Sequence, residues 1–114
     1  MDLKHELISL AAVNLPPSYF EKEFHITFEN DYDDLDFYKI SILCIDRGPM
    51  FALMRYRGHP KGTTTICLLK KIENADDIFD VLKEDYSEML EIIIKELKLK
   101  NSDISWTRMD DPDL

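Results

Sequence analysis

The chain has 114 residues, of which 45% are apolar and 32% charged, with five prolines and three glycines. These values predict one compact domain spanning residues 1–114, and they exclude a disordered tail, a collagen-like chain and a repeat array. The formal net charge of −9 argues against a general nucleic-acid or anionic-membrane binder, because both need a cationic surface.

The first segment has apolar residues at helical spacing. They recur three to four positions apart at Leu3, Leu7, Leu10 and Ala11. We expect a short helix with Asp2 as its N-cap. The helix ends before Pro16-Pro17, because a helix interior does not accommodate proline. Residues 1–10 also carry charged side chains where a signal peptide needs an uninterrupted apolar stretch, so the sequence predicts a cytoplasmic protein.

After the prolines the apolar period changes to two. Phe24, Ile26 and Phe28 share one face, which predicts a half-buried strand from Glu23. Three further strands are expected over residues 37–45, 50–57 and 63–72, separated by glycine- and proline-containing turns. Four strands joined by short connections predict an antiparallel meander.

A second, longer helix is predicted over residues 74–100, followed by a short extended piece over residues 104–108. The expected fold is α+β, with a four- to five-stranded antiparallel sheet, an N-terminal and a long C-terminal helix packed on one face, and the order α-β-β-β-β-α-β. The uncovered face would carry polar side chains, namely Lys39, Ser41, Arg55, Arg57, Thr63 and Thr65, with His25 as a further candidate. A register error of one residue would exchange the two faces.

Cys44 and Cys67 lie within apolar runs, without a CxxC motif or a flanking histidine at ligand spacing. We expect both to be reduced core residues, and we expect no metal and no cofactor.

Charge divides the chain into three blocks. Residues 1–38 carry a formal charge of −7, residues 39–71 carry +6, and residues 72–114 carry −8. The densest cluster is the acidic segment, residues 29–36, which places five carboxylates within eight residues. The segment does not match a calcium-binding loop, because Leu35 stands where an oxygen ligand is needed and Asp36 stands where glycine is required. A solvated loop without a role and a loop that binds a basic partner both remain open.

Catalytic motifs are missing from the sequence. His5, His25 and His59 are isolated, and no serine, cysteine or aspartate stands at a spacing that builds a nucleophile with its base. The sequence therefore predicts a protein that is not an enzyme. A weaker alternative is a small phosphodiester enzyme that uses His25 with Arg55 or Arg57.

The size, acidity, element order and carboxylate-rich segment resemble the immunity proteins of bacterial toxin systems, including contact-dependent growth inhibition. This resemblance implies an inhibitor that binds one cognate basic toxin, often a nuclease, and blocks its active site or an exosite. From charge clustering we expect the partner contacts at Asp31, Tyr32, Asp33, Asp34, Asp36, Asp76, Asp77, Asp80 and Glu84. The main alternative is an adaptor that self-associates through a sheet edge or the strand around Trp106.

Overall fold

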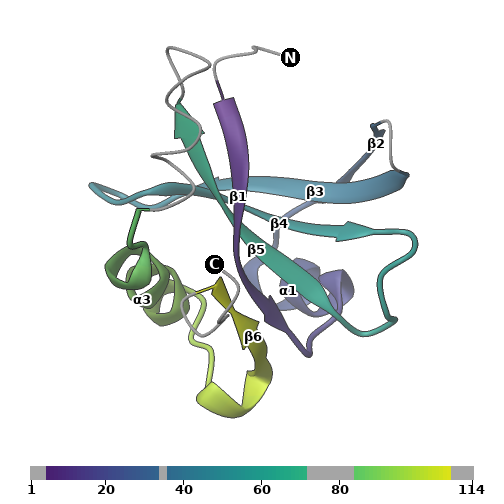
Figure 1. Ribbon diagram of the computed structural model, residues 1–114. Helices are drawn as coiled ribbons and strands as arrows, with labels where there is room; N and C mark the ends of the chain where they lie inside the picture. Colours follow the sequence, from purple (N-terminus) through teal and green to yellow (C-terminus); the bar gives the residue numbers. More distant parts are fainter. Residues whose placement is uncertain (1–4, 34–35, 72–83, 109–114) are drawn as a thin grey trace.

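The computed structural model describes residues 5–33, 36–71 and 84–108 (Figure 1). Its elements are β1 (His5–Val13), α1 (Pro17–Phe24), β2 (Glu29–Tyr32), β3 (Phe37–Cys44), β4 (Met50–Tyr56), β5 (Thr64–Lys71), α3 (Ser87–Glu96), the 3-10 turn η2 (Asn101–Asp103) and β6 (Ile104–Thr107). The strands form one antiparallel sheet in the order β2-β3-β4-β5-β1-β6. The predicted α+β class is confirmed, but the described sheet has six strands where four or five were expected.

The predicted meander is confirmed where β-branched and aromatic residues dominate the sequence. β3, β4 and β5 follow the expected ranges within one or two residues, and each pairs with its neighbour in sequence. The extended piece predicted around Trp106 is β6, which pairs with β1 and forms one edge of the sheet.

The predicted N-terminal helix is wrong, because residues 5–13 form the strand β1. β1 has a bulge where its pairing with β5 shifts between Ser9 and Ala11. A bulge adds one residue to a strand, so two consecutive side chains, Leu10 and Ala11, are both buried. The bulge interrupts the apolar alternation of the strand, so the apolar residues Leu7, Leu10 and Ala11 fall at the three- to four-residue spacing typical of a helix.

The two prolines begin a helix instead of ending one. Pro16 has extended backbone angles and Pro17 is the first residue of α1, where the missing N–H costs nothing. The strand predicted from Glu23 is therefore also wrong: Phe24 ends α1, and His25 caps it with a φ of 55°. Strand pairing starts only at Glu29, inside the acidic segment that was predicted to be a loop.

The predicted C-terminal helix is confirmed in part by α3, which covers residues 87–96. Residues 74–83 of that prediction lie outside the described residues. Tyr86 precedes α3 and is fully buried, and its carbonyl accepts a 2.9 Å hydrogen bond from the Leu90 N–H. Leu90 and Ile93 turn toward the sheet and are buried.

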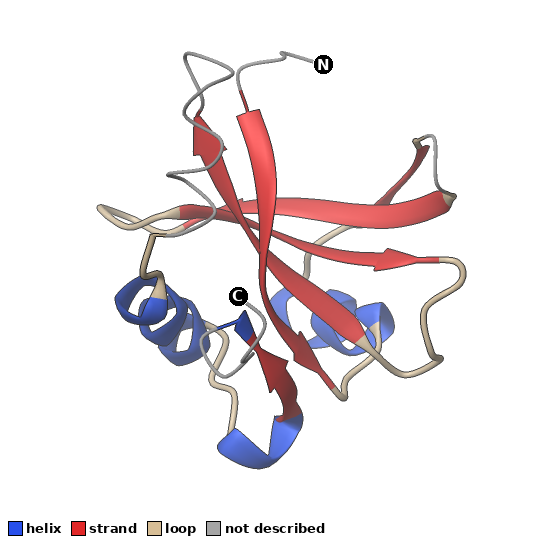
Figure 2. Cartoon of the chain, viewed as in Figure 1, coloured by secondary structure: helices blue, strands red, loops and turns tan. Residues whose placement is uncertain are grey.

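The helices α1 and α3 cover the same face of the sheet, here called the helix face (Figures 1 and 2). Phe20 of α1 and Ile93 of α3 join one core cluster with side chains of β1, β4 and β5. A smaller cluster of Ala52, Met54 and Cys67 lies on the opposite face, here called the open face. β4 thus buries side chains on both faces, as is usual for a central strand.

The predicted assignment of polar residues to the open face is largely wrong. Ser41 lies opposite Leu53 and is 6% exposed, so it belongs to the helix face, and Lys39 and Arg55 lie on that same face. The open face instead carries the apolar residues that alternate with them. Thr65 does lie on the open face, opposite Met54. Successive residues of a strand point to opposite faces, so assigning one side of β3 wrongly exchanges all of its side chains. The prediction placed the more apolar side of β3 beneath the helices, whereas that side faces away from them.

Candidate functional site

The acidic segment begins as an exposed edge strand. All four residues of β2 are exposed, and one side of the strand lacks a neighbour in the sheet. Glu29 lies opposite Ile40 and Asp31 lies opposite Tyr38, so both carboxylates stand on the open face. Asp31 also accepts a 2.8 Å hydrogen bond from the Tyr32 N–H.

The carboxylate of Asp33 is engaged by the chain itself. Tyr56 Oη donates a 2.5 Å hydrogen bond to one of its oxygens, and the Asp36 N–H donates a 3.1 Å bond to the other. Burial raises the pKa of Tyr56 to about 12, and the hydrogen bond to Asp33 and that carboxylate's charge act in the same direction. The neighbouring Tyr38 also has a raised pKa, through burial first and then the charges of Asp31 and Asp33.

The charge of Asp36 is also compensated internally. Its carboxylate lies 2.9 Å from Arg57 Nη2 and accepts hydrogen bonds from the backbone N–H groups of Phe37 and Gly58. The Arg57 guanidinium in turn stands 5.1 Å from the centre of the Phe37 ring. Asp33 and Asp36 therefore hold the turn after β2 in place.

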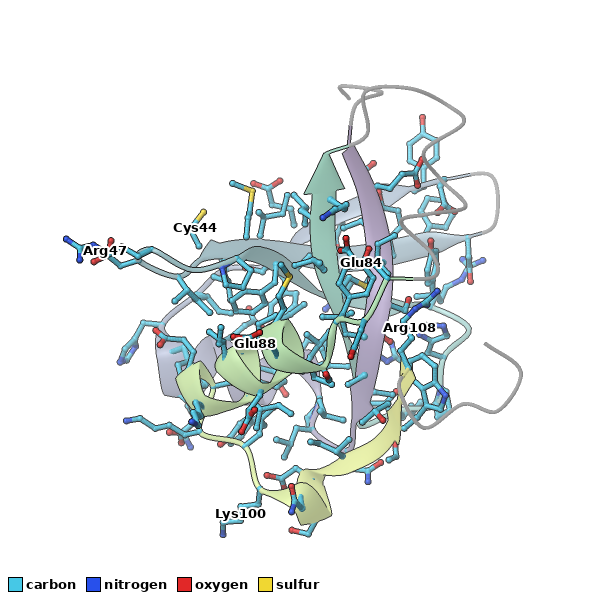
Figure 3. The ribbon with its side chains drawn as sticks, turned by 60° about the vertical axis from the view of Figure 1, so that its left-hand side comes forward. Cys44, Arg47, Glu84, Glu88, Lys100 and Arg108 are labelled. Carbon is cyan, nitrogen blue, oxygen red and sulfur yellow. The ribbon has the colours of Figure 1, made fainter. Side chains whose placement is uncertain are left out.

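The predicted contact residues that the structure describes separate into three groups. Asp31 and Tyr32 are exposed on the edge strand, whereas Asp33 and Asp36 are hydrogen-bonded within the chain. Glu84 forms a 3.2 Å ion pair with Lys70 of β5, which is separated from β2 by two strands, so it does not join the acidic segment (Figure 3). The remaining predicted residues, Asp34, Asp76, Asp77 and Asp80, lie outside the described residues.

Two exposed aromatic rings accompany the acids. Tyr32 is 71% exposed and Phe37 is 56% exposed, and their ring centres lie 5.8 Å apart across the β2–β3 pair. Large exposed aromatic side chains of this kind are enriched at protein interfaces.

The open face has an apolar centre that the sequence analysis missed. Ile42 is 54% exposed, Met50 is 43% exposed and Leu7 is 37% exposed. They border the buried cluster of Ala52, Met54 and Cys67, together with the half-buried Tyr38, Ile40, Tyr56 and Leu69. Cys44 lies at the end of this surface and is exposed, so its prediction as a core residue is wrong, while Cys67 is buried as expected. The signal in the sequence was the strict alternation of Tyr38, Ile40 and Ile42 with polar residues, assigned to the wrong face.

His25 and His59 lie in connecting segments of the chain. His25 caps the C-terminus of α1, and the ring of His59 in the β4–β5 turn lies edge-on to Tyr56 with 5.3 Å between centres. Within the described ranges, no three His, Cys, Asp or Glu side chains are grouped as metal ligands would be.

The helices in the described part of the chain are too short or too polar to cross a membrane. Comparisons of the chain with protein-family models, with curated proteins and with solved structures find no match.

Proposed function

We propose that this chain is a non-catalytic protein-binding domain of the immunity type, which neutralises a cognate basic toxin, expected to be a nuclease. The observation that carries the proposal is the open face: Ile42 and Met50 are exposed at its apolar centre, and the carboxylates of Glu29 and Asp31 stand at its border. An apolar centre with a charged border is the usual composition of a specific protein interface.

The electrostatics favour a basic partner. The chain carries a formal charge of −9, and Glu29 and Asp31 concentrate negative charge beside the apolar centre. A nuclease lines its groove with lysine and arginine to hold phosphates, so an acidic surface competes for that groove and associates rapidly by electrostatic steering. Tyr32 and Phe37 add exposed aromatic side chains at the β2 edge, on the helix-face side of the strand pair.

The proposal is tested by capturing the partner on the immobilised protein and following its release with salt. We expect one stoichiometric basic protein, released only at high salt, whose toxicity on expression is abolished by co-expression of this chain. The variants Glu29→Lys/Asp31→Lys and Ile42→Asp should weaken the complex by about 2 kcal/mol or more each. Glu91→Lys/Glu96→Lys on the exposed side of α3 is the matched control, because it makes the same charge change away from β2.

Equal capture by the edge-strand variant and the α3 control would contradict the proposed surface. A captured protein whose toxicity is unchanged by this chain would contradict the immunity function itself. Concentration-dependent dimers in sedimentation velocity that disappear in Ile42→Asp would instead support the self-associating adaptor, since the same apolar face suits a second copy.

A further inference from the structure

Three cations of the basic block, residues 39–71, lie on the helix face where β3 pairs with β4. Lys39 of β3 lies directly opposite Arg55 of β4, and Arg57 follows two positions later on the same side. Like charges directly opposite one another destabilise a strand pair. The repulsion between these cations therefore destabilises the β3–β4 pair locally, although the chain as a whole carries a net charge of −9.

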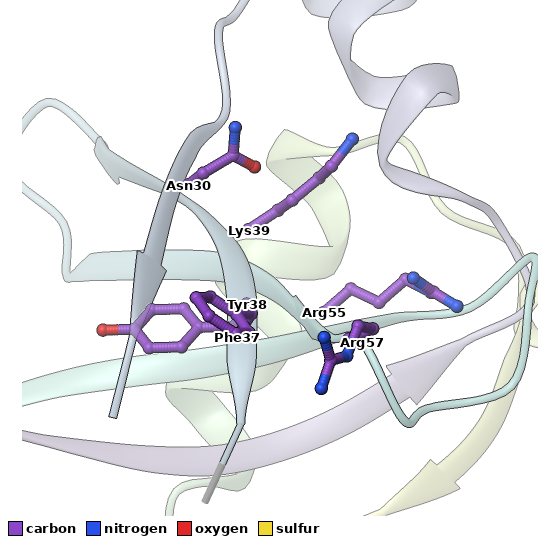
Figure 4. Close-up of a pocket in the computed structure, with 6 residues that line it drawn as sticks. All are labelled: Asn30, Phe37, Tyr38, Lys39, Arg55 and Arg57. Carbon is purple, nitrogen blue, oxygen red and sulfur yellow. The ribbon is translucent and has the colours of Figure 1, made fainter. Parts of the chain in front are cut away.

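These cations line a hollow of about 260 Å³, here called the cationic hollow (Figure 4). Its lining consists of Asn30, Phe37, Tyr38, Lys39, Arg55 and Arg57. A second hollow of about 270 Å³ beside α1 shares Lys39 and Arg55 and adds Lys61. Among the residues lining the two hollows, Glu21 is the single carboxylate, so positive charge dominates their walls.

Arg55 is held in a fixed position without losing its charge. Its Nη2 donates a 2.9 Å hydrogen bond to the His59 carbonyl, and its Nε donates a 3.4 Å bond to the Pro60 carbonyl. Carbonyl oxygens orient a guanidinium but do not neutralise it, and three of its five N–H donors remain. No ion pair involves Lys39, Arg55 or Lys61 in the described part of the chain, whereas Arg57 is paired with Asp36.

We propose that the cationic hollow binds the phosphate group of a small phosphorylated ligand, held by Lys39 and Arg55. A planar guanidinium fork and an ammonium on the paired strand match the oxygens of a phosphate, and Phe37, on the same face as Lys39, lines the hollow for the organic part. The hollow is smaller than the roughly 300–1,000 Å³ typical of drug-sized ligands, which favours a small molecule. A long polyanion is disfavoured, because the rest of the chain repels it.

The test uses amide chemical shifts of the isotope-labelled chain, titrated with inorganic phosphate and with ribose 5-phosphate at constant ionic strength set by chloride. We expect saturable shifts at residues 30, 37–39 and 55–57, with tighter binding of the sugar phosphate. Lys39→Gln alone, and together with Arg55→Gln, should weaken binding by about tenfold or more. Lys39→Gln makes the test independent of the turn contacts of Arg55, because it leaves the hydrogen bonds from Arg55 to the His59 and Pro60 carbonyls in place.

The matched control is Arg47→Gln/Lys95→Gln, which removes one arginine and one lysine elsewhere. Arg47 stands at the tip of the β3–β4 turn (Figure 3), and Lys95 is exposed on α3. Equal weakening of phosphate binding in this control would overturn the proposal. Amide shifts that do not saturate up to about 10 mM ligand would also overturn it, because both results indicate nonspecific electrostatic attraction. Tighter binding of triglutamate or of a single-stranded oligonucleotide than of ribose 5-phosphate would also overturn the assignment to a small phosphate.

Discussion

Tyr56 Oη donates a 2.5 Å hydrogen bond to Asp33 Oδ2, which joins the turn after β2 to the end of β4. β2 lies at the edge of the sheet and pairs with β3 alone, so this bond supplements a single ladder. Together with the ion pair of Asp36 and Arg57, it engages two carboxylates of the acidic segment within the chain. Asp31 and Glu29 remain as the carboxylates presented by the strand.

Removal of the Tyr56 hydroxyl should destabilise the fold. Tyr56→Phe eliminates the hydrogen bond to Asp33, and we expect it to lower the free energy of unfolding by about 1 kcal/mol. Urea denaturation near neutral pH measures the change. Tyr32→Phe is the control, because the Tyr32 side chain is 71% exposed and its replacement should cost less than about 0.5 kcal/mol. Equal stabilities of the two variants would contradict a structural role for this bond.

Stability should fall in alkali for a related reason. Tyr56 ionises at a pKa of about 12 in the folded state and near its ordinary value of 10.0 when unfolded, so the native state retains a proton that the unfolded state loses between these values. The free energy of unfolding therefore decreases as the pH rises from about 10 toward 12. Urea denaturation at several pH values should show a shallower decrease in Tyr56→Phe. A residual slope is expected, because the pKa of Tyr38 is also raised.

The assignment of the two faces predicts unequal costs for the same substitution. Ile66 is fully buried beneath the helices, and Ile66→Ala should lower the free energy of unfolding by about 2–5 kcal/mol. Ile42 is 54% exposed on the open face, and Ile42→Ala should cost less than about 1 kcal/mol. Denaturant titrations of both variants provide the comparison. A larger loss for Ile42 would mean that the register of β3 is shifted by one residue.

The two thiols should differ in reactivity. Cys44 is exposed, whereas Cys67 is buried and burial raises its pKa to about 11, so it presents almost no thiolate at neutral pH. We expect a thiol reagent such as Ellman's reagent to modify one cysteine rapidly and the second only after denaturation. Mass spectrometry of the digested protein identifies the site, and Cys44→Ser should abolish the rapid phase. Rapid modification of Cys67 would contradict its position beneath the open face.

Local sequence patterns were sufficient for the strands that pair with their neighbours in sequence. β3, β4 and β5 have apolar alternation bounded by turns, and both properties act within a few residues. β1 was missed because its bulge is imposed by pairing with β5, more than fifty residues away in the chain. Pro17 illustrates a different limit, since proline ends a helix in its interior but begins one at the first position.

The candidate site was predicted in part for a similar reason. Charge density located the acidic segment, yet no local pattern revealed that Tyr56 and Arg57 would occupy two of its carboxylates. The separation of these charges across the sheet also follows from pairing. Because Lys39 lies opposite Arg55 while Asp31 lies opposite Tyr38, the two cations and the Asp31 carboxylate stand on different faces.

The strand order has a consequence for synthesis on the ribosome. β1 emerges first, yet its two neighbours in the sheet are β5 and β6, which end at Lys71 and Thr107. During most of translation β1 therefore has neither partner, and after β5 docks it still presents an open edge until the last strand arrives. Because an unpaired edge templates association with other chains, a ribosome stalled before residue 104 would release a product prone to aggregate.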